Sequence, residues 1–308
     1  MSDLLVSVPG RTLRDAVEAM GPLPDVEFIE WDLNAPAPRD RFDIVVPPYM
    51  DALGRLGALA SVQTRLVQSQ SIGYDGVEDA LPAGVVYANA ASVHEASTAE
   101  LTVGLILAAQ RGIPDFVRAA DRGQWQPSRR PSLADRSVLL VGVGGVGRAI
   151  ADRLAPFEVL LTRVARHARD DDRGHVHGID ELPRLLPEAE IVVIAVPLSE
   201  QTTGLVDAAF LAALPDGALV VNIARGAVLD TPALLAELQS GRLRAALDVT
   251  DPEPLPDGHP LFTAPGVLIS PHVGGATTAM MPRMARLLRD QIERMLRGKP
   301  PRNVVLRT

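Results

Sequence analysis

The chain has 308 residues, of which 47% are hydrophobic and 22% are charged, and this length and composition predict about two ordinary globular domains. Its formal net charge of -8 at pH 7 gives no general attraction to nucleic acid or to anionic lipid, so we expect neither as a partner. Cysteine is absent, which excludes disulfides, a thiol nucleophile and thiolate metal ligands. No secretory signal or membrane-spanning apolar run is visible, and we expect a cytoplasmic protein.

The first part of the chain alternates short apolar runs with helical patterns. The apolar runs include LLVSV at 4–8, VEFIEW at 26–31, FDIVV at 42–46 and GVVYANA at 84–90. This alternation predicts a parallel sheet covered by helices. Residues 95–120 are long and apolar enough to predict a buried helix that leaves this first unit, and the polar, proline-bearing residues 121–136 predict a connecting loop.

A second alternating series follows, with apolar runs at 137–142, 158–165, 189–197, 217–224, 242–249 and 265–271. Six strands with crossovers make a complete dinucleotide-type sheet. The predicted fold class is therefore α/β with two doubly wound domains. A Rossmann-type cofactor domain, residues 98–279, is inserted in a flavodoxin-like substrate domain formed by residues 1–97 and 280–308. A closing helix over 278–298 is expected to pack back on the first domain.

A glycine fingerprint follows the first strand of the second series. Gly142, Gly144 and Gly147 have the G-x-G-x-x-G spacing between an apolar strand and a helical pattern. The first glycine permits a tight turn, the second lets the backbone approach a pyrophosphate, and the third lets the helix close on the strand. The amides of Gly145 and Val146 would face the anion. The fingerprint predicts a dinucleotide site, although a tight turn in any doubly wound domain, or a methyltransferase loop, has a related pattern.

The residues after the next strand bear on the choice between NAD and NADP. An NAD site normally offers an acidic side chain to the ribose there, whereas a 2'-phosphate calls for arginine. Here Ala165 falls near the expected place, with Arg163, Arg166 and Arg169 around it. We predict NADP as the preferred cofactor, bound through Arg163 and Arg166. NAD is the alternative if Asp170 serves instead, and a solvated arginine-rich loop is the other interpretation.

Three polar residues follow later strands, at the edge where open α/β sheets bind their ligands: Arg225, Glu253 and His272. An arginine fork can hold a carboxylate, a histidine can move a proton near neutral pH, and a glutamate can orient and charge that histidine. Alone, each has an ordinary alternative as an ion-pair, loop or turn residue. Together, after a dinucleotide fingerprint, they predict a site for hydride and proton transfer.

Nearly the whole chain resembles the D-isomer-specific 2-hydroxyacid dehydrogenases, a family that includes glyoxylate/hydroxypyruvate reductases. The resemblance rests on SIGYDGVE, NAASVHEASTAELTVGLILA, VGVGGVG, PLSEQTTGLV, NIARGAVLD, ALDVTDPEPL, SPHVGGAT and RGKPPRNVV. It implies an NAD(P)-dependent reductase of small 2-keto acids, and a homodimer. The family's catalytic arginine falls on Arg225, its histidine-supporting glutamate on Glu253 and its acid/base on His272.

The resemblance also implies contacts outside this catalytic group. Main-chain amides of Ile72 and Gly73 fall where the family holds the substrate carboxylate. Thr202 and Asp248 match cofactor-facing positions, although alone they could be caps or turn residues. The full set of implied cofactor contacts beyond the fingerprint and the arginines is Pro197, Thr202, Ile223 and Asp248.

Other histidines and one serine depart from the family pattern or lie outside it. Ser92 stands where the family often has glycine, and His94 follows it, which leaves substrate preference open. We favour a helix-entry or solvated role for His94 over a substrate contact. His175 and His177 lie two residues apart, but no third ligand is evident nearby, so no metal site is predicted.

Alternative functions share the predicted fold. Nucleotide-sensing corepressors use it to bind NAD and recruit partners, and fold alone cannot separate the two classes. The sequence shows no long unstructured tail of the kind that a corepressor would use. A short phosphoglycerate dehydrogenase is a further alternative, and a formate dehydrogenase is poorly supported.

Overall fold

The computed structural model describes residues 4–308, which divide into two compact units. The first unit comprises residues 4–94 with 277–308, and the second comprises residues 95–276. Sequence patterns put the corresponding ends at 97 and 279; in the structure the second unit begins with helix α4 (Glu95–Arg111). Among the described residues, no helix combines the length and apolar character needed to cross a membrane.

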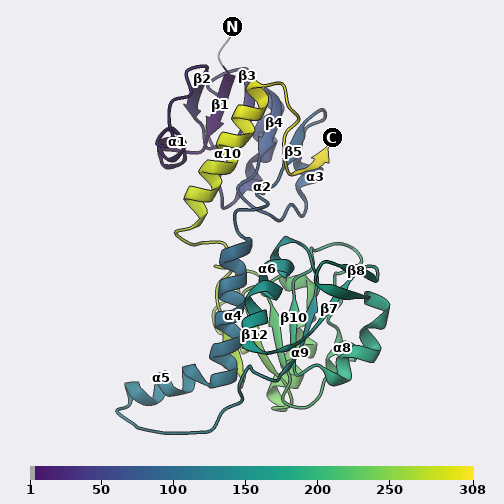
Figure 1. Ribbon diagram of the computed structural model, residues 1–308. Helices are drawn as coiled ribbons and strands as arrows, with labels where there is room; N and C mark the ends of the chain where they lie inside the picture. Colours follow the sequence, from purple (N-terminus) through teal and green to yellow (C-terminus); the bar gives the residue numbers. More distant parts are fainter. Residues whose placement is uncertain (1–3) are drawn as a thin grey trace. The chain divides into compact units, whose positions relative to one another are not determined.

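The first unit is built on a six-stranded sheet (Figure 1). Its strands are β1 (Leu4–Val8), β2 (Val26–Glu30), β3 (Arg41–Val45), β4 (Gln63–Gln68), β5 (Val86–Ala88) and β14 (Val304–Arg307). They lie in the order β14-β5-β4-β3-β1-β2, and β14 is antiparallel to β5 while the other pairs are parallel. The parallel strands therefore have the 2-1-3-4-5 order of flavodoxin-like folds, which confirms the predicted class.

Helices bury both faces of this sheet. Helices α1 (Arg11–Glu18) and α10 (Met280–Leu296) pack against each other and against Ile44 and Leu66 on one face. The opposite face buries Val45 and Val67 with residues from the 3-10 helix at 56–61, which follows α2 (Ala52–Arg55), and from α3 (Val77–Ala80). Neighbouring strand residues point to opposite faces, so each of the five parallel strands contributes to both cores. The predicted return of the closing helix to the first unit is confirmed.

The second unit is built on an eight-stranded sheet. Its strands are β6 (Ser137–Val141), β7 (Leu160–Ala165), β8 (Arg169–Asp171), β9 (Gly174–Gly178), β10 (Ile191–Ile194), β11 (Leu219–Asn222), β12 (Arg244–Leu247) and β13 (Val267–Ile269). The order is β13-β12-β11-β10-β6-β7-β9-β8, and only β8 is antiparallel to its neighbour. From β9 to β13 this is the 3-2-1-4-5-6 order of dinucleotide-binding sheets with one strand added, which confirms the Rossmann class.

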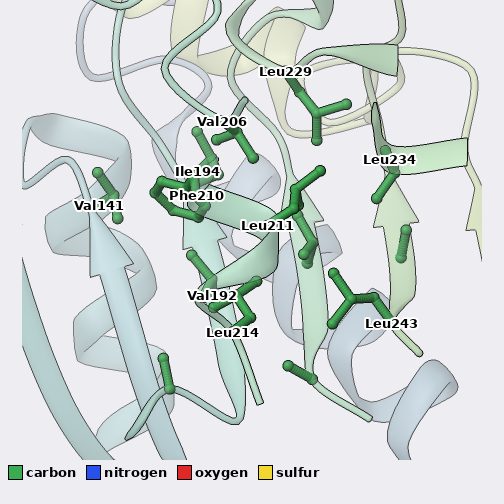
Figure 2. Close-up of a cluster of buried hydrophobic side chains, with 14 of the residues drawn as sticks. Val141, Val192, Ile194, Val206, Phe210, Leu211, Leu214, Leu229, Leu234 and Leu243 are labelled. Carbon is green, nitrogen blue, oxygen red and sulfur yellow. The ribbon is translucent and has the colours of Figure 1, made fainter. Parts of the chain in front are cut away.

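Two cores lie on the faces of this second sheet. Helices α4 and α6 (Gly145–Leu154) pack together over one face. The other face buries Val192 and Ile194 of β10 beneath Phe210 and Leu211 of α8 (Ala208–Ala212), as Figure 2 shows. Leu234 of α9 (Thr231–Gln239) extends the same cluster (Figure 2), and Leu182 of α7 (Leu182–Leu185) also belongs to it.

Two predicted elements differ from the structure. The helix predicted over 95–120 is two helices, because Gly112 takes a left-handed φ of 64° between α4 and α5 (Ile113–Asp121). The hairpin β8–β9 was not predicted as strands. Its residues RDD and GHVHG carry almost no apolar signal, since Val176 is its one buried hydrophobic residue.

Candidate active site

The glycine fingerprint forms a turn that only glycine fits at two of its three positions. Gly142 has a φ of 107°, and a Cβ there would lie 2.4 Å from the carbonyl oxygen of Ala195. A Cβ on Gly147 would lie 1.9 Å from the carbonyl oxygen of Gly142. A Cβ on Gly144, by contrast, would meet no protein atom within 4 Å, so open space remains beside this backbone.

The start of helix α6 has the chemistry of an anion site. Within residues 4–308, the N–H groups of Gly145 and Val146 donate to no protein acceptor, and no side chain caps this helix end. Unpaired N–H groups and the helix dipole together favour a negative charge here. The open space at Gly144 and these two amides therefore fit the pyrophosphate of a dinucleotide.

Arg163 does not face this site, contrary to the sequence prediction. Its side chain is 6% exposed, and both terminal nitrogens donate to the carboxylate of Asp171 at 2.9 Å. One nitrogen also donates to the carbonyls of Gly174 and His175. The hydrogen bonds from Arg163 are the main reason that the pKa of Asp171 lies below its ordinary value. Arg163 thus ties strand β7 to the β8–β9 hairpin and is unavailable to a ligand.

Arg166 lies directly after strand β7, where a dinucleotide site contacts the ribose or its 2'-phosphate. It is exposed, and its guanidinium donates to the side-chain oxygen of Gln201 at 2.8 Å. Asp170, the possible ribose acid, instead lies 2.9 Å from Nδ1 of His175 across the hairpin. Among Arg163, Arg166 and Asp170, only Arg166 contacts the loop after β10 through its side chain.

The loop after β10 is held by its own hydrogen bonds. Thr202 is buried, and its hydroxyl donates to the carbonyl of Pro197 at 2.6 Å while accepting from the N–H of Ser199 at 2.8 Å. Ile223, just beyond β11, is also buried. These residues shape the edge of the sheet, and direct cofactor contacts from Pro197, Thr202 and Ile223 stay predictions.

Arg225 stands on a tight turn at the carboxyl end of β11. The side-chain amide of Asn222 donates to the carbonyl of Arg225 at 3.0 Å and accepts from the N–H of Ala224 at 3.0 Å, which closes the turn. A Cβ on Gly226 would lie 1.9 Å from the carbonyl oxygen of Thr250. Glycine is required there because the turn bearing Arg225 packs directly on the segment that leads to Glu253.

Glu253 and His272 are in direct contact. Oε1 of Glu253 lies 2.5 Å from Nδ1 of His272, and Oε2 accepts from the N–H of Thr250 at 3.4 Å. A carboxylate can only accept, so Nδ1 carries a proton and Nε2 is the nitrogen left to exchange one with a ligand. The side chain of His272 is 45% exposed and that of Glu253 is 38% exposed, which leaves the pair accessible. The structure thus brings together two residues that lie 19 positions apart.

Asp248 holds the segment that carries His272. Its buried carboxylate accepts from the hydroxyl of Ser270 at 2.7 Å and from the N–H groups of Val273 and Gly274 at 3.0 Å. Its carbonyl accepts from the N–H of His272 at 2.7 Å. The sequence suggested only a place near the cofactor for Asp248; this clamp was missed because its partners follow in a different loop.

In the first unit, Ile72 and Gly73 follow β4 at the carboxyl edge of the sheet. Neither N–H donates to a protein acceptor within residues 4–308, and both residues are partly exposed. Ser92, in the loop after β5, has a φ of 82°, the left-handed conformation that glycine adopts most readily. His94 directly precedes α4 and is buried, so its predicted place at the helix entry is right and a solvated role is wrong.

His175 and His177 have a third neighbour that the sequence did not indicate. Glu181 and the two histidines offer possible metal ligands within 4.8 Å of one another. The carboxylate of Glu181 already accepts from the N–H of Gly178 and lies 2.9 Å from Nδ1 of His177, and Arg184 pairs with it. These bonds, led by that of Gly178, lower the pKa of Glu181 to about 2. This network joins the end of β9 to α7.

Comparisons with known proteins identify the family of the chain. A family model described as D-isomer specific 2-hydroxyacid dehydrogenase, NAD binding domain, matches residues 103–274. The chain is 30% identical over 297 residues to the glyoxylate reductase/hydroxypyruvate reductase of Homo sapiens, with 90% of each protein covered. It is 33% identical over 253 residues to the glyoxylate reductase of Thermofilum pendens, with 79% of this chain and 75% of that protein covered.

A solved structure resembles the whole chain. The D-isomer specific 2-hydroxyacid dehydrogenase from Xanthobacter autotrophicus Py2, in complex with NADPH and MES, matches with a TM-score of 0.83 at 30% identity. The match covers 99% of this chain and 98% of the other. The chain therefore belongs to the D-isomer specific 2-hydroxyacid dehydrogenases, oxidoreductases that act on the CH-OH group of 2-hydroxy acids, as its motifs predicted.

Proposed function

We propose that this chain is a reductase of small 2-keto acids, with glyoxylate and hydroxypyruvate as substrates and NADPH as the preferred cofactor. The observation that carries the proposal is the contact between Glu253 and His272, which leaves Nε2 to exchange a proton with a ligand. The names of the relatives from Homo sapiens and Thermofilum pendens support this substrate class.

The residues of the second unit account for the proton chemistry. When bound, a reduced nicotinamide supplies the hydride that adds to the keto carbon. His272, protonated at both nitrogens, gives the Nε2 proton to the carbonyl oxygen that becomes the hydroxyl. Glu253 stabilises the doubly protonated imidazole through Nδ1 and fixes the orientation of the ring. In the oxidative direction Nε2 takes the proton back.

Two groups have the chemistry to bind the carboxylate of the substrate. Arg225 presents a guanidinium on a turn held by Asn222, and such a fork matches a carboxylate bidentately. In the first unit, the adjacent amides of Ile72 and Gly73 have no protein acceptor among residues 4–308 and can bind a carboxylate. We assign both to substrate binding.

The preference for NADPH rests on Arg166. It directly follows β7, where an NAD enzyme would place an acid, and it is exposed. The relative from Xanthobacter autotrophicus was crystallised with NADPH. Since Arg163 is committed to Asp171, we assign recognition of the 2'-phosphate to Arg166 alone.

We also propose that the chain forms a homodimer through the α5 region. Ile113, Val117 and Trp125 are 47%, 55% and 95% exposed, and they lie on α5 and just after it. Within the second unit this region projects away from the sheet (Figure 1). Large apolar side chains gathered on a projecting segment are typical of a protein interface.

The test of the function is the loss of reduced-nicotinamide absorbance, followed with NADPH and NADH in parallel. The substrates are glyoxylate, hydroxypyruvate, 3-phosphohydroxypyruvate and phenylpyruvate. We expect turnover of the first two, with a higher kcat/KM for NADPH.

A D-3-phosphoglycerate dehydrogenase of Methanocaldococcus jannaschii is 31% identical over 78% of this chain, which itself covers 47% of that protein. A preference for the phosphorylated acid would replace our assignment, and NADPH binding without any turnover would favour a nucleotide sensor.

A further inference from the structure

Three loops of the first unit meet at one edge of its sheet. They follow β3, β4 and β5, which are neighbouring parallel strands. The loop after β3 contains Tyr49, the loop after β4 runs through Gln70 to Gly73, and the loop after β5 ends at His94. Because carboxyl ends of parallel strands meet at the same edge, the amides of Ile72 and Gly73 lie among these loops.

Hydrogen bonds to the loops after β3 and β5 hold the segment from Gln70 to Gly73 in place. The side-chain amide of Gln70 donates to the carbonyl of Pro47 in the loop after β3 at 2.9 Å. The side chain of Asn89, after β5, donates to the carbonyl of Ile72 at 2.8 Å, and the N–H of Ala90 donates to the carbonyl of Ser71 at 2.9 Å. The carbonyls of this segment are therefore held while two of its N–H groups stay available to a ligand.

His94 supplies one more of these ties. Its Nε2 lies 2.6 Å from the carbonyl oxygen of Gln70, and because a carbonyl can only accept, Nε2 must carry the proton. Both residues are buried, at 5% and 4% exposure. The ring of His94 also stacks on Tyr49 at 5.4 Å between centroids and 19° between planes. One histidine thus joins all three loops.

We propose that His94 is a positioning residue for substrate binding: by fixing the Gln70 carbonyl, it aims the amides of Ile72 and Gly73 at the substrate carboxylate. The inference rests on the proposed function, because those amides bind a carboxylate only if the substrate is such an acid. Rotation of the peptide after Gln70 would disturb the two amides that follow, since the chain connects them directly. A buried hydrogen bond of this kind resists that rotation.

The test separates the hydrogen bond of His94 from its ring. His94→Gln can place an amide N–H near the position of Nε2, whereas His94→Phe keeps the stack on Tyr49 and has no donor. We expect His94→Phe to raise KM for glyoxylate or hydroxypyruvate about tenfold, the effect of one hydrogen bond. Its kcat and its KM for NADPH should change little, and His94→Gln should restore most of the loss. The affinity for oxalate, titrated in the presence of NADPH, should likewise fall in His94→Phe and be largely restored in His94→Gln.

A second variant, at Gln70, tests the same proposal if His94→Phe does not fold. Gln70→Met removes the bond to Pro47 while leaving the Gln70 carbonyl in place, and it should raise KM in the same direction. An unchanged KM and oxalate affinity in folded His94→Phe would overturn the proposal. So would equal losses in the Gln and Phe variants, which would assign the effect to the ring. If the unaltered enzyme reduces no 2-keto acid, the proposed function fails by itself, and the oxalate titrations still decide the role of His94.

Discussion

His272 occupies a backbone conformation that few residues other than glycine adopt. Its φ is 52°, in the left-handed region, and its N–H donates to the carbonyls of Asp248 and Ser270 at 2.7 and 3.0 Å. The cost of this conformation is of order 1–3 kcal/mol, and it persists only where the surroundings fix it. Asp248 provides that constraint, and Glu253 then fixes the ring. The orientation of Nε2 therefore depends on both acids.

The first prediction concerns His272→Asn. Asparagine tolerates the left-handed region, so this variant should fold normally, but it has no nitrogen that can exchange a proton. We expect kcat to fall by about 10²- to 10⁴-fold, the usual contribution of a general acid or base. NADPH binding, measured by fluorescence titration, should be nearly unchanged. Turnover near the original rate would remove His272 from the mechanism.

The second prediction distinguishes the roles of Arg163, in strand β7, and Arg166, directly after it. Arg166→Ala should weaken NADPH binding while leaving NADH binding nearly unchanged, because only NADPH carries the 2'-phosphate. Arg163→Ala should instead lower the free energy of unfolding, since it removes the bonds of the buried guanidinium to Asp171, Gly174 and His175. Dissociation constants and denaturant unfolding measure the two effects. Equal losses for both cofactors in Arg166→Ala would contradict the 2'-phosphate assignment.

At the scale of elements, the turn between β6 and α6 has room for a side chain at Gly144 but none at Gly147. The third prediction compares Gly144→Ala with Gly147→Ala. A methyl group at 144 meets no protein atom, so thermal stability should hold while NADPH affinity falls, because the methyl fills space beside the anion site. A methyl group at 147 meets a carbonyl at 1.9 Å, so this variant should be strongly destabilised. Loss of stability in Gly144→Ala, with unchanged affinity, would contradict the assignment of that space to the cofactor.

Asp43 joins three parallel strands of the first unit and gives the fourth prediction. Burial by itself would raise the pKa of Asp43, but hydrogen bonds from the N–H of Leu5 and from Arg41 and Arg65 outweigh it and hold the pKa below its ordinary value. The ionised form is therefore favoured by folding. This stabilisation is present above about pH 4, the unfolded value, and is lost as the pH falls through the folded pKa.

We expect Asp43→Asn to lower the free energy of unfolding at pH 7 by about 1–3 kcal/mol, through weakened buried hydrogen bonds. The difference between the two proteins should shrink on going from pH 5 to pH 3 in urea titrations. A constant difference over that range would show that the charge of Asp43 contributes nothing to stability.

At the scale of the whole molecule, the fifth prediction concerns assembly. Light scattering after size exclusion should give twice the chain mass of 32.8 kDa. Val117→Glu combined with Trp125→Glu should shift the protein toward the monomer, because charges would be buried at the proposed interface. Phe262→Glu, at another apolar residue of the second unit that is 54% exposed, serves as the control and should leave the mass unchanged. A wild-type monomer would refute the homodimer.

The sequence by itself determined the fold class, the family and the residues of the fingerprint, because these depend on local periodicity and on spacing between near neighbours. It also identified Arg225, Glu253 and His272 as candidates. Only the tertiary structure decided how they are held: the contact between Glu253 and His272 and the clamp of Asp248 on the loop of His272 join separate strand ends. The same holds for Arg163, whose guanidinium looks available in the sequence but is bound by Asp171 of a hairpin without apolar periodicity. Side-chain pairing across loops depends on chain folding in three dimensions, and no local pattern records it.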